Sequence, residues 1–154
     1  CAQYLDSNYI VHILGFGDEV SIEKLIENIS KVNEISSCKV IYHGVKSGDK
    51  FISFLKNCHI GLSTQKAEGE YLDSSFPSKI LTYLGTGLRG VSADIECVKA
   101  SPISDLIFYY NLDIPKEIAK VIKSIDIRQP YNSIRRLEEL HQRFIKELKI
   151  LIEA

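Results

Sequence analysis

The chain has 154 residues, a net charge of −1 and a hydrophobic fraction of 45%. These values fit one globular domain with a core of its own, and they argue against the strongly basic surface typical of nucleic-acid-binding proteins. No apolar run approaches the length that spans a bilayer, and no signal peptide is visible at the N-terminus.

The cysteines at Cys1, Cys38, Cys58 and Cys97 are scattered, without a C-x-x-C pair. This pattern argues against a zinc site and against a disulfide framework, and it suits a reducing compartment. We therefore expect a cytoplasmic protein. Because the chain contains no methionine and begins at Cys1, we also expect it to be a piece of a longer protein.

Short runs of apolar and β-branched residues predict strands at 9–14, 38–42, 58–63, 88–92 and 105–110. Helical spacing of apolar residues predicts helices at 20–32, 47–56, 95–99, 115–125 and 132–152, and a further short helix within 74–87. This alternation predicts an α/β, Rossmann-like fold over residues 1–154. We expect one domain with a mostly parallel sheet, helices on both faces and a long C-terminal helix.

The stretch 74–87 is the most informative part of the sequence. Ser75 is predicted to cap its helix by accepting from the backbone N–H of Ser78, with Pro77 in the first turn. Gly85 and Gly87 suit the end of the helix and the tight return to the next strand.

Lys79 lies near the start of this helix, where free N–H groups and the positive end of the dipole attract anions. A lysine there favours a phosphate site, although a solvated surface lysine is an equally good interpretation. Ile80, Leu81 and Leu84 are predicted to face the core. Ligands of parallel sheets bind beyond the carboxyl ends of the strands, so the loops 15–18, 43–46 and 64–78 should share one rim.

Three histidines lie in or next to predicted strands, where a histidine can contact a ligand. His12 and His59 lie within predicted strands and are better explained as core histidines than as ligands. His43 lies at a strand end beside a glycine and is a candidate contact.

The last helix carries five basic residues, at Arg135, Arg136, Arg143, Lys146 and Lys149. These side chains allow peripheral contact with the inner face of a membrane. Interleaved glutamates favour a solvated face instead.

Several segments resemble the donor-binding, C-terminal domain of GT-B glycosyltransferases, and most closely the retaining, GT4-like group (glycosyl transferases group 1). They are YIVHILGFG (9–17), CKVIYHGV (38–45), NCHIGLS (57–63) and FPSKILTYLGTGLRGVS (76–92). The last is the most specific, being similar to the family pattern "fpsKl.EYla.GkPVvas", although residues 88–90 replace its lysine–proline pair. Residues 105–125 resemble the last strand and following helix of that domain.

The resemblance implies that the chain binds a nucleoside-diphosphate sugar, most often a UDP-sugar, for glycan, capsule or lipopolysaccharide synthesis. The pyrophosphate would lie at the helix start and the base against the loop after the second strand. The implied donor contacts are His43, Gly44, Val45, Ser74, Ser75, Phe76, Pro77, Ser78, Lys79 and Thr82.

Two positions depart from the family pattern. Thr82 stands where a glutamate usually binds the ribose hydroxyls, and a threonine can make one such hydrogen bond where a carboxylate makes two. Ser74 stands where a second glutamate contacts the sugar, with Glu68, Glu70 and Asp73 nearby as substitutes.

The resemblance also implies a partner domain. The N-terminal acceptor domain, with the catalytic residues, would precede Cys1, so this chain alone should bind donor without turnover. No metal cofactor is expected, because the helix dipole and basic side chains neutralise the leaving diphosphate. Two alternatives stay open: a Rossmann-like interaction or regulatory module without donor binding, and another nucleotide-sugar enzyme such as an epimerase.

Overall fold

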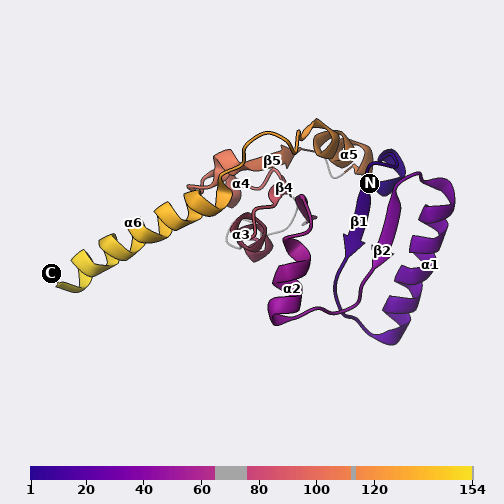
Figure 1. The fold of residues 1–154 in the computed structure, drawn as a ribbon, viewed down its shortest axis with the longest axis horizontal. Coiled ribbons are helices and arrows are strands. Elements are labelled where there is room, and N and C mark those ends of the chain that lie inside the picture. Colours follow the sequence, from indigo (N-terminus) through magenta and orange to yellow (C-terminus); the bar gives the residue numbers. More distant parts are fainter. Residues whose placement is uncertain (65–75, 112–113, 154) are drawn as a thin grey trace. The chain divides into compact units, whose positions relative to one another are not determined.

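The computed structural model describes residues 1–64, 76–111 and 114–153, which form strands and helices in alternation (Figure 1). The strands are β1 (Ile10–Ile13), β2 (Lys39–Tyr42), β3 (Ile60–Ser63), β4 (Arg89–Ala93) and β5 (Ile107–Tyr110). The α-helices are α1 (Glu19–Ile35), α2 (Gly48–Leu55), α3 (Ser78–Gly85), α4 (Glu96–Lys99), α5 (Pro115–Ser124) and α6 (Ser133–Glu153). Short 3₁₀ helices are η1 (Ala2–Tyr4) and η2 (Ser104–Leu106). The predicted strands and helices are therefore all present, with ends shifted by a few residues.

Within the described residues, the strands pair as two parallel sheets flanked by helices, which confirms the Rossmann-like α/β class. The chain divides into two compact units. The N-terminal unit comprises Cys1–Ser53 and Ile114–Ile125, and the C-terminal unit comprises Phe54–Asp113 and Asp126–Ala154. The single domain expected over 1–154 stays a prediction, and each unit is described by itself.

In the N-terminal unit, β1 and β2 run parallel and α1 packs against β2. Asp18 caps α1, because its carboxylate accepts from the Ser21 backbone N–H at 2.9 Å and from the Ser21 hydroxyl at 2.6 Å. Farther along α1, the Asn33 amide donates to the Val40 carbonyl at 3.0 Å and accepts from the Val40 N–H at 2.8 Å. These two bonds fix α1 against the backbone of β2.

In the C-terminal unit, β4 is the central strand between β3 and β5, and all of its residues are buried. The helix α3 packs against both β3 and β4, and α6 packs against α3. In Figure 1 the first turns of α6 lie near α3, and its later turns extend beyond the sheet of this unit. Five of the largest fully buried apolar side chains lie in this unit: Ile80, Leu84, Leu88, Val91 and Val98.

The core prediction for α3 is correct at two positions and wrong at one. Ile80 and Leu84 are fully buried, whereas Leu81 is 46% exposed. Leu81 is next to Ile80 in the sequence, and successive side chains of an α-helix point about 100° apart around the helix axis. The face of α3 that packs on the sheet is therefore narrower than the sequence pattern indicated.

The predicted start of α3 is also corrected. The helix begins at Ser78, and Pro77 rather than Ser75 occupies the N-cap position, with its carbonyl accepting from the Ile80 N–H at 2.9 Å. A proline disfavours helical backbone in the residue before it, so Phe76 cannot begin the helix. At the other end the prediction is confirmed: α3 ends at Gly85, and Gly87 has a φ of 85° in the returning turn.

Candidate functional site

The start of α3 is the first part of the candidate site. Ser78 and Lys79 are exposed, Pro77 is buried and Phe76 is half-buried. In the described part of the chain no side chain caps this end, and no acidic residue lies in the first turn. The positive end of the helix dipole and the Lys79 ammonium therefore both lie at the start of α3, and no carboxylate in the first turn offsets their charge. This arrangement can bind an anion.

Thr82 follows Ser78 by one turn of α3, so the two lie on the same side of the helix. Thr82 is half-buried, and its hydroxyl donates to the Ser78 carbonyl at 3.5 Å, which is a long hydrogen bond. The hydroxyl is thus held only weakly and can rotate toward a ligand. Ser74 and Ser75, the remaining predicted contacts on this side, lie outside the described residues.

The other predicted contacts lie in the N-terminal unit, where β1 and β2 end. Gly44 has a φ of 64°, a backbone conformation that glycine adopts readily, and its carbonyl accepts from the Gly15 N–H at 3.0 Å. The Tyr42 hydroxyl donates to the Gly15 carbonyl at 2.9 Å. These bonds bring together the loops 15–18 and 43–46, two of the three loops predicted to share a rim. Val45 is 64% exposed beside them.

His12 is not a core residue, which corrects the sequence-based interpretation. It is exposed on β1, and its Nδ1 lies 2.9 Å from Nε2 of His43, with the ring centroids 5.0 Å apart. His59 is exposed as well. The sequence could not show the His12–His43 pair, because it depends on the register of two strands. Partial burial lowers the pKa of His12, and the neighbouring His43 lowers it further.

The lowered pKa of His12 predicts that the stability of the protein depends on pH. We expect stability to fall as pH drops below about 6.5, because the unfolded chain protonates His12 at its ordinary pKa while the folded protein resists the proton. A proton NMR titration of the folded protein should give His12 a pKa below about 6.5. In His43→Asn, the pKa of His12 should move toward that ordinary value. A His12 pKa at or above the ordinary value in the folded wild type would contradict this expectation.

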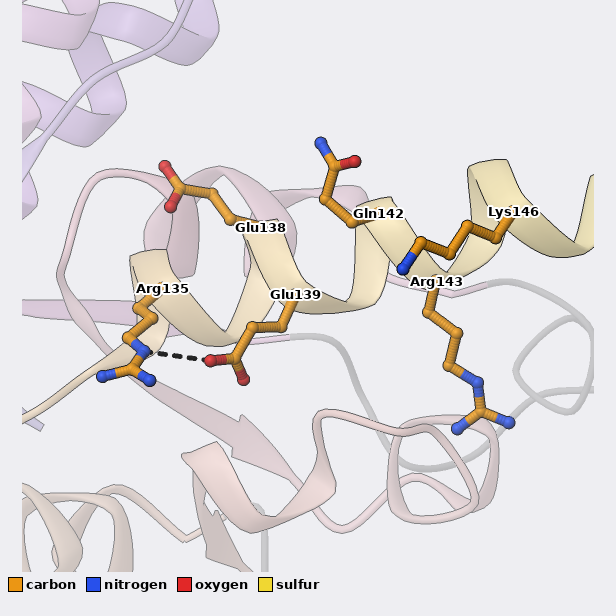
Figure 2. Close-up of a pocket in the computed structure, with 6 residues that line it drawn as sticks. All are labelled: Arg135, Glu138, Glu139, Gln142, Arg143 and Lys146. Atoms are coloured by element: carbon orange, nitrogen blue, oxygen red, sulfur yellow. Dashed lines mark hydrogen bonds and ion pairs between the residues drawn. The ribbon is translucent and has the colours of Figure 1, made fainter.

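Two of the five basic residues of α6 form ion pairs with glutamates of the same helix. The Arg135 guanidinium lies 2.9 Å from Glu139, and that of Arg143 lies 2.8 Å from Glu147. Figure 2 shows the side chains that line a pocket along α6, and all of them project from this one helix. A hollow built by a single helix has no opposite wall to enclose a small molecule. The ion pairs favour the solvated face that the interleaved glutamates indicate.

Two kinds of site are not found in the described ranges. No helix in them has the length and apolar content needed to cross a bilayer. No group of three or more His, Cys, Asp or Glu side chains among these residues could hold a metal ion.

A row of three residues with buried hydroxyl groups, Ser63, Ser92 and Tyr109, lies in the C-terminal unit and could not be predicted from the sequence. Single serines within strands are unremarkable, and only the pairing of β3, β4 and β5 places these three together.

Comparisons of the chain with models of protein families, with curated proteins and with solved structures gave no match. The resemblance to glycosyltransferases therefore stays a prediction from the sequence.

Proposed function

We propose that the chain is the donor-binding part of a GT-B glycosyltransferase and that it binds a nucleoside-diphosphate sugar, with a UDP-sugar favoured. The observation that carries the proposal is the start of α3, where Ser78 and Lys79 are exposed at an uncapped helix end without acidic neighbours in the first turn. This helix begins the segment that most closely resembles the family, and helix starts are common binding sites for phosphate.

The proposal gives each part of the candidate site a role. Backbone N–H groups of the first turn and the Lys79 ammonium receive the pyrophosphate. The hydroxyl of Thr82 reaches one ribose oxygen. The contact of His43, Gly44 and Val45 with the base stays an expectation from the family resemblance. The donor sugar is then transferred to an acceptor held by a second domain, which supplies the catalytic residues.

The proposal is tested by comparing Lys79→Ala with Thr82→Ala in calorimetric titrations with UDP, GDP and ADP. We expect Lys79→Ala to weaken binding by about tenfold or more, because it removes a charge-assisted contact worth about 1.5 kcal/mol or more. Thr82→Ala removes at most one neutral hydrogen bond and should weaken binding less.

Lys116 offers a matched control, because it is an exposed lysine in the first turn of another helix, α5. Lys116→Ala should leave the affinity unchanged. Equal and negligible effects of Lys79→Ala and Lys116→Ala would remove Lys79 from the site.

One observation favours the second candidate, a Rossmann-like interaction or regulatory module without donor binding. Thr82 replaces the expected glutamate, and its hydroxyl is directed at the carbonyl of its own helix. In that case none of the three nucleotides would bind at millimolar concentration.

A further inference from the structure

Three residues of the C-terminal unit that carry hydroxyl groups lie side by side in the sheet. Ser63 of β3 pairs with Ser92 of β4, and Ser92 pairs with Tyr109 of β5. Residues paired in this way project to the same face of a sheet. Ser63 is 2% and Ser92 0% exposed, and the hydroxyl oxygen of half-buried Tyr109 is also buried. Within the described part of the chain, none of these three hydroxyls has a hydrogen-bond partner.

The row faces α3. Gly61 and Gly90 form the preceding row of the same face, since each lies two residues before a serine of the row. A Cβ on Gly61 would meet the ring of Tyr83, and one on Gly90 would lie 3.7 Å from the Leu84 side chain. Both of these contacts are with α3, so Ser63 and Ser92 project toward this helix as well.

The row lies level with the start of that helix. As the crossover between parallel strands, α3 runs back against the strand direction. Two residues of a strand cover about 6.6 Å, which equals roughly four residues of an α-helix. Tyr83 and Leu84 lie over the row of Gly61 and Gly90, so the residues of α3 that lie over the row of Ser63 and Ser92 are about four positions earlier, at Lys79 and Ile80. The unpartnered serines therefore point at the first turn of α3, where the helix is uncapped.

Other buried hydroxyls of the same unit are satisfied. The Ser133 hydroxyl, which is also fully buried, donates to the Leu84 carbonyl at 2.8 Å. The hydroxyls of Tyr131 and Tyr110 donate to the carbonyls of Leu106 and Ser63 at 2.7 and 3.1 Å. Because buried polar groups are normally bonded, the row is an exception that needs a partner from outside the described residues.

We infer that Ser63 and Ser92 are ligand-binding residues that donate hydrogen bonds to phosphate oxygens of a nucleoside diphosphate held at the start of α3. This inference rests on the proposed function, and it adds two residues of the sheet to the phosphate contacts at the start of α3. Neighbouring strands lie about 4.8 Å apart, so one oxygen between the two serines can accept from both at about 2.7 Å.

The surrounding charges are compatible with an anion. Lys79 and the dipole of α3 lie on the helix side, and the nearby carboxylate of Asp94 is paired with Lys99 at 2.9 Å. Burial, and then the carboxylates of Asp94 and Asp105, raise the pKa of Tyr109 to about 12. Its hydroxyl therefore stays protonated at neutral pH and can donate to the same ligand.

The test titrates the intact chain and its Ser63→Ala and Ser92→Ala variants with UDP and, separately, with inorganic pyrophosphate. We expect each variant to bind both probes about tenfold more weakly, the effect of losing one hydrogen bond to a charged group. The melting temperatures of the unliganded variants should be unchanged or higher, because each substitution removes an unsatisfied buried hydroxyl. Ser133→Ala is the matched control: it should lower the melting temperature and leave the affinity of the folded protein unchanged.

Wild-type affinity for both probes in both serine variants would overturn the inference, and the proposed function would survive if UDP still bound. Serine-dependent binding of pyrophosphate without any binding of UDP would support the phosphate site and count against the nucleotide-sugar function. If neither probe binds the wild type, both ideas fail. A lowered melting temperature with unchanged affinity would show that the hydroxyls serve the fold alone, which also overturns the inference.

Discussion

Gly61→Ala is expected to lower the free energy of unfolding by about 3 kcal/mol, as forced overpacking of a core does. The added Cβ would fall within the ring of Tyr83, which lies on α3 directly over β3. The ring cannot simply turn away, because α3 is packed on the sheet and the nearest ring atom is Cγ, which lies next to the helix backbone and moves little when the side chain rotates. The helix α3 must therefore move away from the sheet, and the side chains of Ile80 and Leu84 lose part of their packing.

Chemical denaturation of the wild type and of Gly61→Ala measures this effect. Gly15→Ala is the control, because nothing lies within 4 Å of the position of a Cβ there and its backbone is ordinary. It should change stability by less than about 0.5 kcal/mol. In a Tyr83→Ala background, Gly61→Ala should cost much less, since the clash is removed. Equal denaturation midpoints for wild type and Gly61→Ala would mean that α3 does not approach β3 this closely.

Arg89→Met is expected to destabilise the protein by about 3 kcal/mol, because two hydrogen bonds from a charged group are lost inside the unit. Arg89 is 8% exposed, and its Nη2 donates to the carbonyls of Ile127 and Gln129 at 2.8 and 2.6 Å. The guanidinium carbon also lies 5.2 Å from the ring centroid of Tyr131. Arg89 thus fixes the segment that leads into α6 against the central strand.

Methionine keeps an unbranched apolar side chain at this position and removes the guanidinium, so the experiment isolates the hydrogen bonds and the charge. The control is Arg136→Met on the exposed face of α6, which should change stability by less than about 0.5 kcal/mol. If Arg89→Met unfolds at the same denaturant concentration as the wild type, the buried guanidinium does not fix the segment before α6 against β4.

The sequence predicts the helices and strands well because each signal is local. Short apolar runs bounded by turn residues identify the strands, and Gly85 and Gly87 identify the end of α3. The capping signal of Ser75 predicts too early a start for α3, because Pro77 disfavours helical backbone in the residue before it.

The parts of the site that the sequence did not predict depend on contacts between distant residues. Arg89 appears in the sequence only as a departure from the family pattern, and its partners lie 38 and 40 residues later. The facing imidazoles of His12 and His43 likewise need the register of β1 and β2. Local spacing contains no information on such pairings, so they emerge only when the strands are placed.

The binding of a nucleotide at the start of α3 can be observed directly in the backbone amide resonances of the chain during titration with UDP. If the helix end holds the diphosphate, the resonances of Ser78 and Lys79 should shift together and saturate, while that of Lys116 in the first turn of α5 stays in place. Resonances of Ser78 and Lys79 that do not move at millimolar UDP would contradict the proposal that this chain binds a nucleotide-sugar donor.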